Sequence, residues 1–196
     1  MFVFGHKPQY EYLIVGLGNP GPTYANTRHN AGFLAVRYLS GKYSASFKSR
    51  FKSEYADVTL NGARCLLQMP QTFMNNSGEA VGALCRYYKL PPERVIVLHD
   101  DITLPPGRIK IKTGGSCGGH NGLASIENHL GSQNYTHVKI GIGAKPHPEM
   151  PLAEFVLGLI PAEDRRQIEE RFPDIAGALE LLCAGQTEKA KATYNQ

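Results

Sequence analysis

A histidine and an aspartate that lie far apart in the sequence are the residues best suited to do chemistry together. His29 follows a glycine-rich segment, and Asp100 follows a run of apolar, mostly β-branched residues. If the strands that precede them are neighbours, the carboxylate can orient the imidazole and stabilise it once it is protonated. The positive end of a helix that starts at His29 would favour the neutral ring. This pair therefore predicts a general base that activates water.

Asparagine amides in loops supply the donors and acceptors that such a base needs around it. Asn19 lies within residues 16–21, Asn75 and Asn76 follow Phe73 and Met74, and Asn121 follows a second glycine-rich segment. An amide presents a fixed donor and a fixed acceptor, which suits peptide groups and developing oxyanions. Each asparagine taken singly is also a common turn or cap residue, and only their convergence on one place would indicate a site.

Residues 16–21 also fit the G-x-G-x-x-G pattern of dinucleotide-binding loops, directly after a predicted strand. That interpretation requires an acid about 20 residues later to hold a ribose hydroxyl. No acid stands between Glu11 and Glu54, and Pro20 and Pro22 stiffen the loop. A version in which an arginine holds a 2′-phosphate stays open as a minor alternative.

Residues 114–118 fit the G-x-S-x-G pattern of a nucleophile elbow, with Ser116 or Cys117 as the nucleophile. The strand predicted before them is basic on one face, whereas an elbow normally follows a buried strand. Only Glu127 and a histidine shortly after it could complete a triad in the usual chain order. A serine esterase is thus one alternative function, and a flexible turn is the simpler interpretation of this segment.

Positive charge is concentrated in the first three quarters of the chain. Residues 1–148 hold 16 basic and 8 acidic residues, a net +8, whereas residues 149–196 hold 5 and 9, a net −4. This asymmetry points to a polyanionic partner. Arg108, Lys110 and Lys112 alternate with apolar residues, so they form either a ladder for phosphates or a protected strand edge. An RNA-binding protein without catalysis is the alternative from another class.

The composition describes an ordinary globular protein. Of 196 residues, 42% are hydrophobic and 19% are charged. The four cysteines are scattered, without a C-x-x-C pair, and no H-E-x-x-H motif is present, so we expect reduced thiols and no metal. Apolar runs are too short for a membrane span, and the N-terminus does not resemble a signal peptide. These features predict a cytoplasmic protein that does not insert into membranes.

Strands and helices alternate along the chain. Asn26 or Thr27 is expected to cap the first helix and Gly41 to end it, and Asn61-Gly62 is expected to join a hairpin. The predicted strands cover residues 12–15, 56–60, 64–68, 94–98, 108–112 and 138–142, and the predicted helices cover 31–39, 78–88, about 123–130 and about 162–192 with breaks at Pro173 and Gly185. This order predicts one α/β domain over 1–196, with a twisted mixed, mostly parallel sheet flanked by helices.

Taken together, these residues resemble the bacterial peptidyl-tRNA hydrolase family. The resemblance runs from about Tyr12 to near the C-terminus, and the order and spacing of its motifs are far more specific than any one of them. The matching motifs are Val15-Gly16-Leu17-Gly18-Asn19-Pro20-Gly21 with Tyr24, Thr27-Arg28-His29-Asn30-Ala31-Gly32, Pro70-Gln71-Thr72-Phe73-Met74-Asn75-Asn76-Ser77-Gly78, His99-Asp100-Asp101 with Leu104-Pro105-Pro106-Gly107, Gly118-Gly119-His120-Asn121-Gly122-Leu123, Ile140-Gly141-Ile142-Gly143 and Phe155-Val156-Leu157-Gly158.

The resemblance implies an activity and a role for each site residue. The family cleaves the ester that joins a peptide to the terminal ribose of tRNA. By resemblance, His29 is the catalytic base, Asp100 orients it, and Asn19 helps to select N-blocked substrates. The remaining positions implied by resemblance are the substrate-binding Tyr24, Phe73, Met74, Asn75 and Asn121 and the tRNA phosphate-binding Lys110, Lys112 and Lys139.

The family also implies a single α/β domain that is usually monomeric and works without a cofactor. The chain departs from the family pattern at Cys117, where a histidine is usual, and at Lys139, where arginine is frequent and would offer a bidentate fork. Residues 1–11 precede the usual start, as an extension of unknown role. Related proteins in chloroplast splicing share much of the pattern, so the fold alone does not establish hydrolysis.

Overall fold

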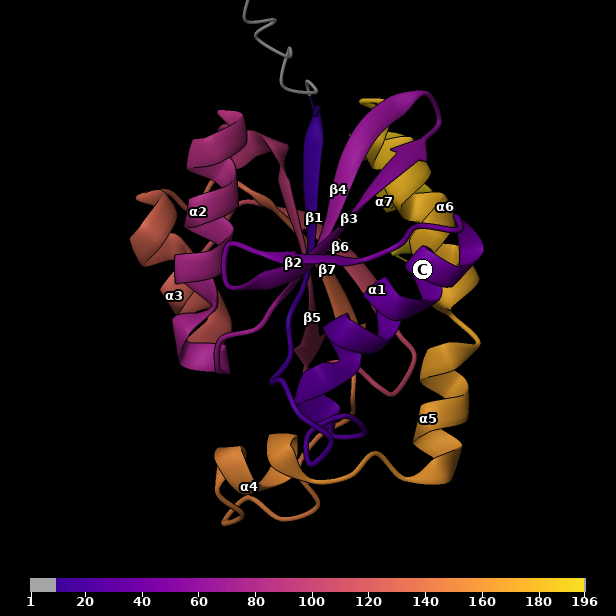
Figure 1. Cartoon of the computed structure of the whole chain (residues 1–196). Coiled ribbons are helices and arrows are strands. Elements are labelled where there is room, and N and C mark those ends of the chain that lie inside the picture. Colours follow the sequence, from indigo (N-terminus) through magenta and orange to yellow (C-terminus); the bar gives the residue numbers. More distant parts are fainter. Residues whose placement is uncertain (1–9, 196) are drawn as a thin grey trace, which may run out of the picture.

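The structure is a computed structural model that describes residues 10–195. Its centre is a seven-stranded sheet in the order β2-β3-β4-β1-β5-β7-β6 (Figure 1). The inner strands β4, β1, β5 and β7 are parallel, whereas β3 and β6 run antiparallel to their neighbours. The prediction of an α/β fold with a mixed, mostly parallel sheet is therefore confirmed.

The elements follow one another in the alternation expected from the sequence. The strands are β1 (Tyr12–Gly16), β2 (Lys48–Arg50), β3 (Ser53–Leu60), β4 (Ala63–Pro70), β5 (Val95–Asp101), β6 (Ile109–Thr113) and β7 (Thr136–Gly141). The α-helices are α1 (Ala31–Lys42), α2 (Ser77–Tyr88), α3 (Asn121–Leu130), α4 (Leu152–Leu157), α5 (Ala162–Glu169), α6 (Phe172–Cys183) and α7 (Thr187–Tyr194). Short 3₁₀ turns lie at Arg28–Asn30, Met74–Asn76 and Pro92–Arg94.

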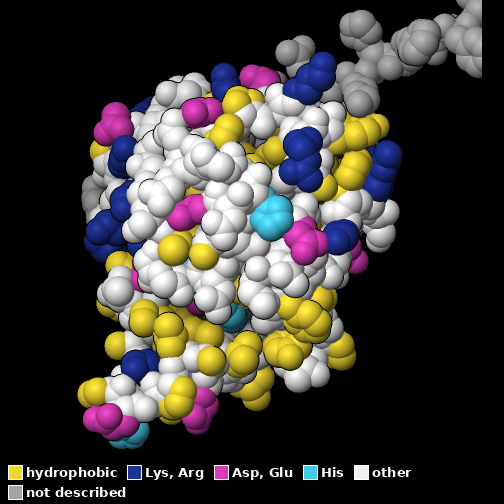
Figure 2. Space-filling model, turned by 90° about the vertical axis from the view of Figure 1, so that its left-hand side faces the viewer, with side chains coloured by type: hydrophobic (Ala, Val, Ile, Leu, Met, Phe, Trp, Pro, Cys, Tyr) yellow, Lys and Arg dark blue, Asp and Glu magenta, His cyan; other side chains and the backbone are white. Residues whose placement is uncertain are grey.

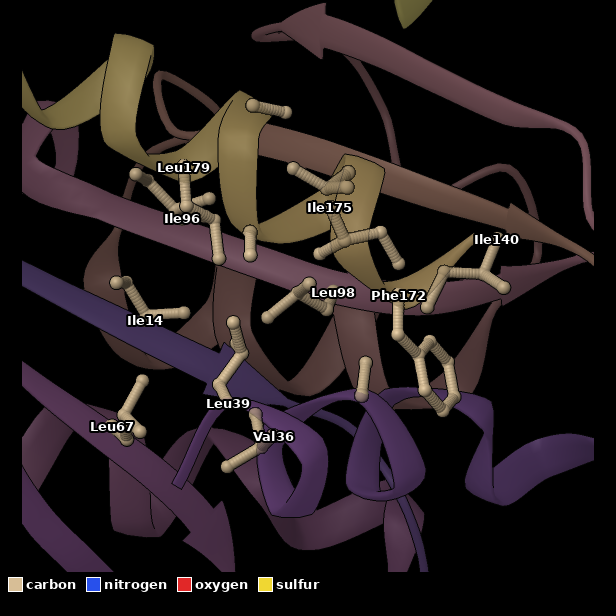
Figure 3. Close-up of a cluster of buried hydrophobic side chains, with 14 of the residues drawn as sticks. Ile14, Val36, Leu39, Leu67, Ile96, Leu98, Ile140, Phe172, Ile175 and Leu179 are labelled. Atoms are coloured by element: carbon tan, nitrogen blue, oxygen red, sulfur yellow. The ribbon is translucent and has the colours of Figure 1, made fainter. Parts of the chain in front are cut away.

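Helices cover both faces of the sheet, so each central strand buries side chains on both sides. The helices α2 and α3 lie on one face, and α1, α6 and α7 lie on the other (Figure 1). Figure 3 shows the second of these cores, where Ile14, Ile96 and Leu98 of the sheet face Leu39 and Leu179 of the helices. Strands buried on both faces read as continuous apolar runs, which is why β1 and β5 were recognisable in the sequence.

The carboxyl ends of the parallel strands point toward the end of the molecule where α4 lies (Figure 1). The strands β1 and β5 are direct neighbours, with Gly16 opposite Leu98. The strand β5 continues past the predicted residue 98 to Asp101, so Asp100 is part of the sheet. This adjacency is the condition under which His29 and Asp100 were predicted to meet.

The first helix begins and ends differently from the prediction. The N-cap of α1 is Asn30 rather than Asn26 or Thr27, because residues Arg28–Asn30 form a 3₁₀ turn before the helix starts. The Thr27 hydroxyl instead donates to the backbone oxygen of Tyr24. Gly41 does not stop the helix, which continues to Lys42.

Two elements were absent from the prediction. The strand β2 has three residues, all exposed, and α4 is a helix of six residues after a turn. The predicted hairpin is confirmed, since Asn61 and Gly62 both have positive φ between β3 and β4. The breaks at Pro173 and Gly185 are also confirmed, because they mark the first turn of α6 and the α6–α7 junction.

Most of the predicted N-terminal extension, residues 1–9, lies outside the described residues. Its last two residues belong to the fold, because Tyr10 packs edge-on against Tyr88 and the Glu11 amide donates to the backbone oxygen of Arg64. Within residues 10–195, no helix combines the length and apolar character that a membrane crossing needs.

Candidate active site

A cleft of about 670 Å³ lies at the carboxyl ends of the parallel strands. Ten of the site residues predicted from the sequence line it, and they come from six separate stretches of the chain. The predicted residues that line it are Asn19, Tyr24, His29, Phe73, Met74, Asn75, Asp100, Lys112, Asn121 and Lys139. Of the predicted site residues, Lys110 does not line this cleft.

The His29 and Asp100 side chains form the predicted pair. His29 Nδ1 lies 2.9 and 3.0 Å from the two carboxylate oxygens of Asp100, and both residues are buried. Because the carboxylate only accepts, Nδ1 carries the proton and donates. The neutral ring then has its lone pair on Nε2, which has no partner among the described residues. The Nε2 of His29, which lines the cleft, is therefore free to accept a proton.

A second histidine shares the same carboxylate. His120 Nε2 lies 3.1 Å from Asp100 Oδ1, while its Nδ1 accepts from the amides of Gly122 and Leu123 at the start of α3. Backbone amides only donate, so Nδ1 is unprotonated and Nε2 carries the hydrogen. Burial alone would raise the pKa of Asp100, but the His120 and His29 rings outweigh it and hold the pKa of this carboxyl well below its usual range.

The Asn19 amide is oriented by its neighbours. Its Oδ1 accepts from the Met74 backbone amide at 2.8 Å, which leaves its two N–H donors for the cleft. The Asn19 backbone is held on both sides by the Asn30 side chain, which accepts from the N–H at 2.9 Å and donates to the carbonyl at 3.0 Å. Asn30 directly follows His29, so one buried amide links the loop of Asn19 to the turn that contains His29.

The other two predicted amides stand free in the cleft. Asn75 lies in the turn before α2 and Asn121 begins α3, and both are exposed without a side-chain hydrogen bond inside residues 10–195. Phe73 is 56% exposed and meets the Tyr24 ring edge-on at 6.2 Å. These amides and rings are open to a ligand rather than used by the fold.

The helix α4 supplies an apolar wall. Figure 2 shows hydrophobic side chains gathered toward the lower end of the molecule, which α4 occupies in Figure 1. Leu152 and Leu157 line the cleft and remain more than 40% exposed. Arg28 anchors this wall, since its guanidinium lies 4.4 Å from the Phe155 ring centroid and donates to the Phe155 backbone oxygen. The Phe155–Gly158 motif thus holds α4 beside the turn of His29.

Two lysines also line the cleft. Lys112 is exposed on β6, whereas Lys139 Nζ lies 2.7 Å from Asp101 Oδ2 and its side chain is 26% exposed. Burial would raise the pKa of Asp101, but Lys139 and Thr103 together lower it, so the carboxylate form is favoured. Lys110 lies opposite Lys139 in the β6–β7 register and is exposed beyond the cleft.

Two buried histidines, His99 and His137, also line the cleft. His137 Nδ1 is 3.3 Å from His99 Nε2, and His99 Nδ1 donates to the backbone oxygen of Asp100. Burial lowers the pKa of His99 to about 3 and that of His137 to about 4. Both rings are neutral near pH 7, so they act as hydrogen-bonding parts of the fold.

The glycine patterns have packing explanations. A Cβ on Gly16 would lie 2.4 Å from the backbone oxygen of Gly32, and one on Gly18 would lie 2.5 Å from the Phe33 ring. These two glycines allow α1 to lie close to the end of β1. Close packing therefore explains the G-x-G pattern without a bound dinucleotide. Neither Ser116 nor Cys117 has the positive φ of a strained elbow, and β6 is an edge strand.

His29, Asp100 and His120 offer possible ligand atoms within 4.8 Å of one another. These atoms already face each other, because both rings direct N–H groups at the carboxylate. The arrangement is that of a hydrogen-bonded base rather than of lone pairs directed at one ion.

Sequence reasoning missed His120 and the pairing of Lys139 with Asp101. A signal for His120 was available, because it directly precedes an apolar helical pattern and so stands at an N-cap position. The pairing of Lys139 depends on the β5–β7 register, which no local pattern reveals.

Comparison with known proteins agrees with this geometry. Residues 13–196 match the family model described as peptidyl-tRNA hydrolase. Proteins named peptidyl-tRNA hydrolase from Gloeobacter violaceus and Mycolicibacterium smegmatis are 43% and 44% identical to this chain; each match covers 93% of this chain, and 93% and 96% of those proteins. A crystal structure of peptidyl-tRNA hydrolase from Acinetobacter baumannii superposes with a TM-score of 0.89 at 36% identity, covering 97% of both chains. The chain belongs to the peptidyl-tRNA hydrolase family.

Proposed function

We propose that this protein hydrolyses the ester between the peptide and the 3′-terminal ribose of peptidyl-tRNA, with His29 as the general base. The observation that carries the proposal is the His29–Asp100 pair, whose free Nε2 belongs to a cleft lined by both apolar side chains and lysines. An ester that joins a peptide to a polyanion matches this mixed lining.

In the proposed reaction His29 Nε2 takes a proton from water as the oxygen attacks the ester carbonyl. Asp100 stabilises the imidazolium, and N–H donors of nearby asparagines stabilise the oxyanion. The imidazolium then returns the proton to the 3′ oxygen of the ribose as the ester C–O bond breaks. General-base assistance contributes about 10²–10⁴-fold and one oxyanion donor about 10²–10³-fold. Every group that moves a proton or stabilises charge in these steps belongs to this chain, and the reactants are water and the ester.

The orientation of Asn19 supports selection of N-blocked substrates. Because its oxygen is held by Met74, only its N–H donors reach the cleft. A peptide carbonyl accepts from such a donor, whereas the α-ammonium of an unblocked aminoacyl-tRNA carries only donors. Asn75 and Asn121 add further free amides for the peptide and the reacting end.

In this proposal the apolar and the basic side chains of the cleft give the substrate a direction. We place the peptide along Tyr24, Phe73 and α4, and the tRNA phosphates toward Lys112, with Lys110 farther out along the edge. Lys139 already forms an ion pair with Asp101. Because Asp101 offsets part of its charge, Lys139 attracts phosphate less strongly than Lys112 does.

The proposal includes a monomer that acts in the cytoplasm without a cofactor. The cysteines are free thiols, which suits a reducing compartment. Size-exclusion chromatography with light scattering tests the monomer, for which we expect a mass of about 21.5 kDa.

The deciding experiment measures hydrolysis of N-acetyl-aminoacyl-tRNA in EDTA, with unblocked aminoacyl-tRNA in parallel. We expect cleavage of the blocked ester only. His29→Ala should lower kcat at least 10²-fold and leave the Kd for tRNA nearly unchanged. His147→Ala, an exposed histidine away from the cleft, is the matched control. Tight tRNA binding without cleavage would instead support an RNA-binding protein, and inactivation by a serine-directed phosphonate would support a serine esterase.

Lys112→Ala should act on binding rather than on chemistry. Removing one phosphate contact should raise KM several-fold and reduce the slope of log Kd against log salt by about one, with kcat nearly unchanged. Lys145→Ala, whose ammonium contacts backbone oxygens of Pro148 and Met150, serves as a charge-matched control. Equal salt slopes for both variants would contradict a phosphate contact at Lys112.

A further inference from the structure

We propose that His120 is a positioning residue, which fixes the Asp100 carboxylate and limits the negative charge that it presents to His29. The kinetic consequence rests on the proposed function, whereas the hydrogen-bond arrangement and its titration behaviour do not. The observation is that one carboxylate oxygen, Asp100 Oδ1, lies 2.9 Å from a His29 nitrogen and 3.1 Å from a His120 nitrogen.

The start of α3 determines the protonation of His120. The amides of Gly122 and Leu123 lie 3.2 and 3.4 Å from Nδ1, where they require an acceptor. A ring with Nδ1 unprotonated has its hydrogen on Nε2, and a doubly protonated ring could not accept from these amides. The helix cap therefore favours the tautomer of His120 that directs its Nε2–H at the carboxylate.

The ring has little freedom to turn away. The His120 side chain is 10% exposed, its ring lies 4.9 Å from that of His29, and the His99 ring meets it edge-on at 5.3 Å. The donor to Asp100 is thus part of a packed layer of three rings. Asn121 directly follows His120 in the chain, so the contacts that fix His120 beside Asp100 also help to fix the position of the Asn121 side-chain amide.

The two rings that donate to Asp100 compete for the negative charge of the same carboxylate. A hydrogen bond from His120 draws charge on Asp100 toward itself, so less negative potential acts on His29. Without that donor, the carboxylate would favour the protonated form of His29 more strongly. A base must be neutral before it can accept a proton from water, so His120 extends the pH range over which the base is available.

Other ionisable groups of the cleft do not take the place of this donor. His99 and His137 are neutral near pH 7, and Asp101 is neutralised by Lys139. Further ionisable side chains that line the cleft are Tyr24, Lys112 and Cys117. For none of the three does the structure give a hydrogen bond to Asp100.

The test uses His120→Asn, because asparagine is a good N-cap but is too short to reach Asp100. The variant keeps an acceptor for the α3 amides and removes the donor to the carboxylate. His120→Ala removes both functions, and His147→Asn repeats the same chemical change at an exposed position. Thermal unfolding should show His120→Asn close to the wild type and His120→Ala lower.

The main measurement is an NMR titration of the His29 ring in the free protein, which needs no turnover. We expect its midpoint to move up by about half to one pH unit in His120→Asn and to stay unchanged in His147→Asn. The acid limb of kcat/KM should move in the same direction, with kcat lower by about tenfold and KM within about twofold.

An unchanged or lowered midpoint in His120→Asn would show that His120 is only a helix cap, and the proposal would be wrong. Ring nitrogen shifts in the wild type test the same point without a variant, since a proton on Nδ1 of His120 would also overturn it. A wild type that fails to cleave the ester would refute the proposed function, and the midpoint would still decide on His120.

Discussion

The Asn30 side chain bonds both backbone groups of Asn19, and its own position follows that of His29. An amide can do this because it carries one acceptor and one donor on the same planar group. Aspartate has the acceptor only, and alanine has neither. The residue therefore positions the Asn19 amide, and through it the contact of Asn19 with Met74.

We expect Asn30→Ala to lower the preference for blocked over unblocked aminoacyl-tRNA. Two buried hydrogen bonds are lost, which costs about 2–3 kcal/mol of stability and frees the loop of Asn19. The ratio of kcat/KM for the two substrates should fall at least several-fold. Asn134→Ala, at an exposed amide that bonds Glu93, is the control. Reduced stability with an unchanged ratio would mean that Asn30 supports the fold without positioning Asn19.

At the scale of elements, the Asn195 side chain forms hydrogen bonds with the exposed backbone edge of strand β6. Asn195 Oδ1 accepts from the Ile111 amide at 2.6 Å, and its Nδ2 donates to the Ile111 carbonyl at 3.0 Å. Arg108 adds a bond to the Asn195 carbonyl. The amide thus satisfies backbone groups that an open strand edge would leave unpaired.

Asn195→Ala should therefore destabilise the fold by about 1–2 kcal/mol, measured as the free energy of unfolding in urea. Amide hydrogen exchange at Ile111 should rise in the same variant. Gln186→Ala removes an exposed amide that makes no side-chain cap bond and should have little effect. Equal stability of both variants would show that water replaces Asn195 at this edge.

The sequence predicted those elements whose signals are local. Continuous apolar runs indicated β1 and β5, and their adjacency brought His29 to Asp100 as expected. The strand β2 was missed because it has three exposed residues and turns back through Phe51 and Lys52, which adopt positive φ without glycine or asparagine. Tertiary contacts stabilise that turn, because the Phe51 ring packs against the Tyr87 ring and Lys52 forms an ion pair with Glu79.

Side-chain direction was the part of the site that the sequence could not supply. The free donors of Asn19 follow from a contact with Met74, 55 residues away, and the tautomer of His120 follows from two backbone amides. Both depend on atoms placed by packing between elements. Lys139 illustrates the same limit, because its basic charge was visible while its partner Asp101 was not.

At the scale of the whole molecule, the sheet separates two cores, and the described His99–His137 pair lies buried within it. Burial lowers the pKa of His99 to about 3 and that of His137 to about 4, from the ordinary histidine pKa of 6.5. The unfolded chain therefore binds more protons than the folded protein between these values. The stability linked to this pair is fully present above pH 6.5 and is lost as the pH falls toward 4 and then 3.

We therefore expect the free energy of unfolding to fall by about 1–3 kcal/mol between pH 7.5 and 5.5, within the window of these two histidines. The buried carboxylates Asp100 and Asp101 have lowered pKa values, so their contribution is lost only below their ordinary range near pH 4. His137→Gln keeps a donor for His99 and removes one titrating ring, so it should reduce the fall between pH 7.5 and 5.5 by up to half. His147→Gln, at an exposed ring, should leave it unchanged. Urea unfolding at both pH values decides the point, and an undiminished fall in His137→Gln would place the acid sensitivity elsewhere in the molecule.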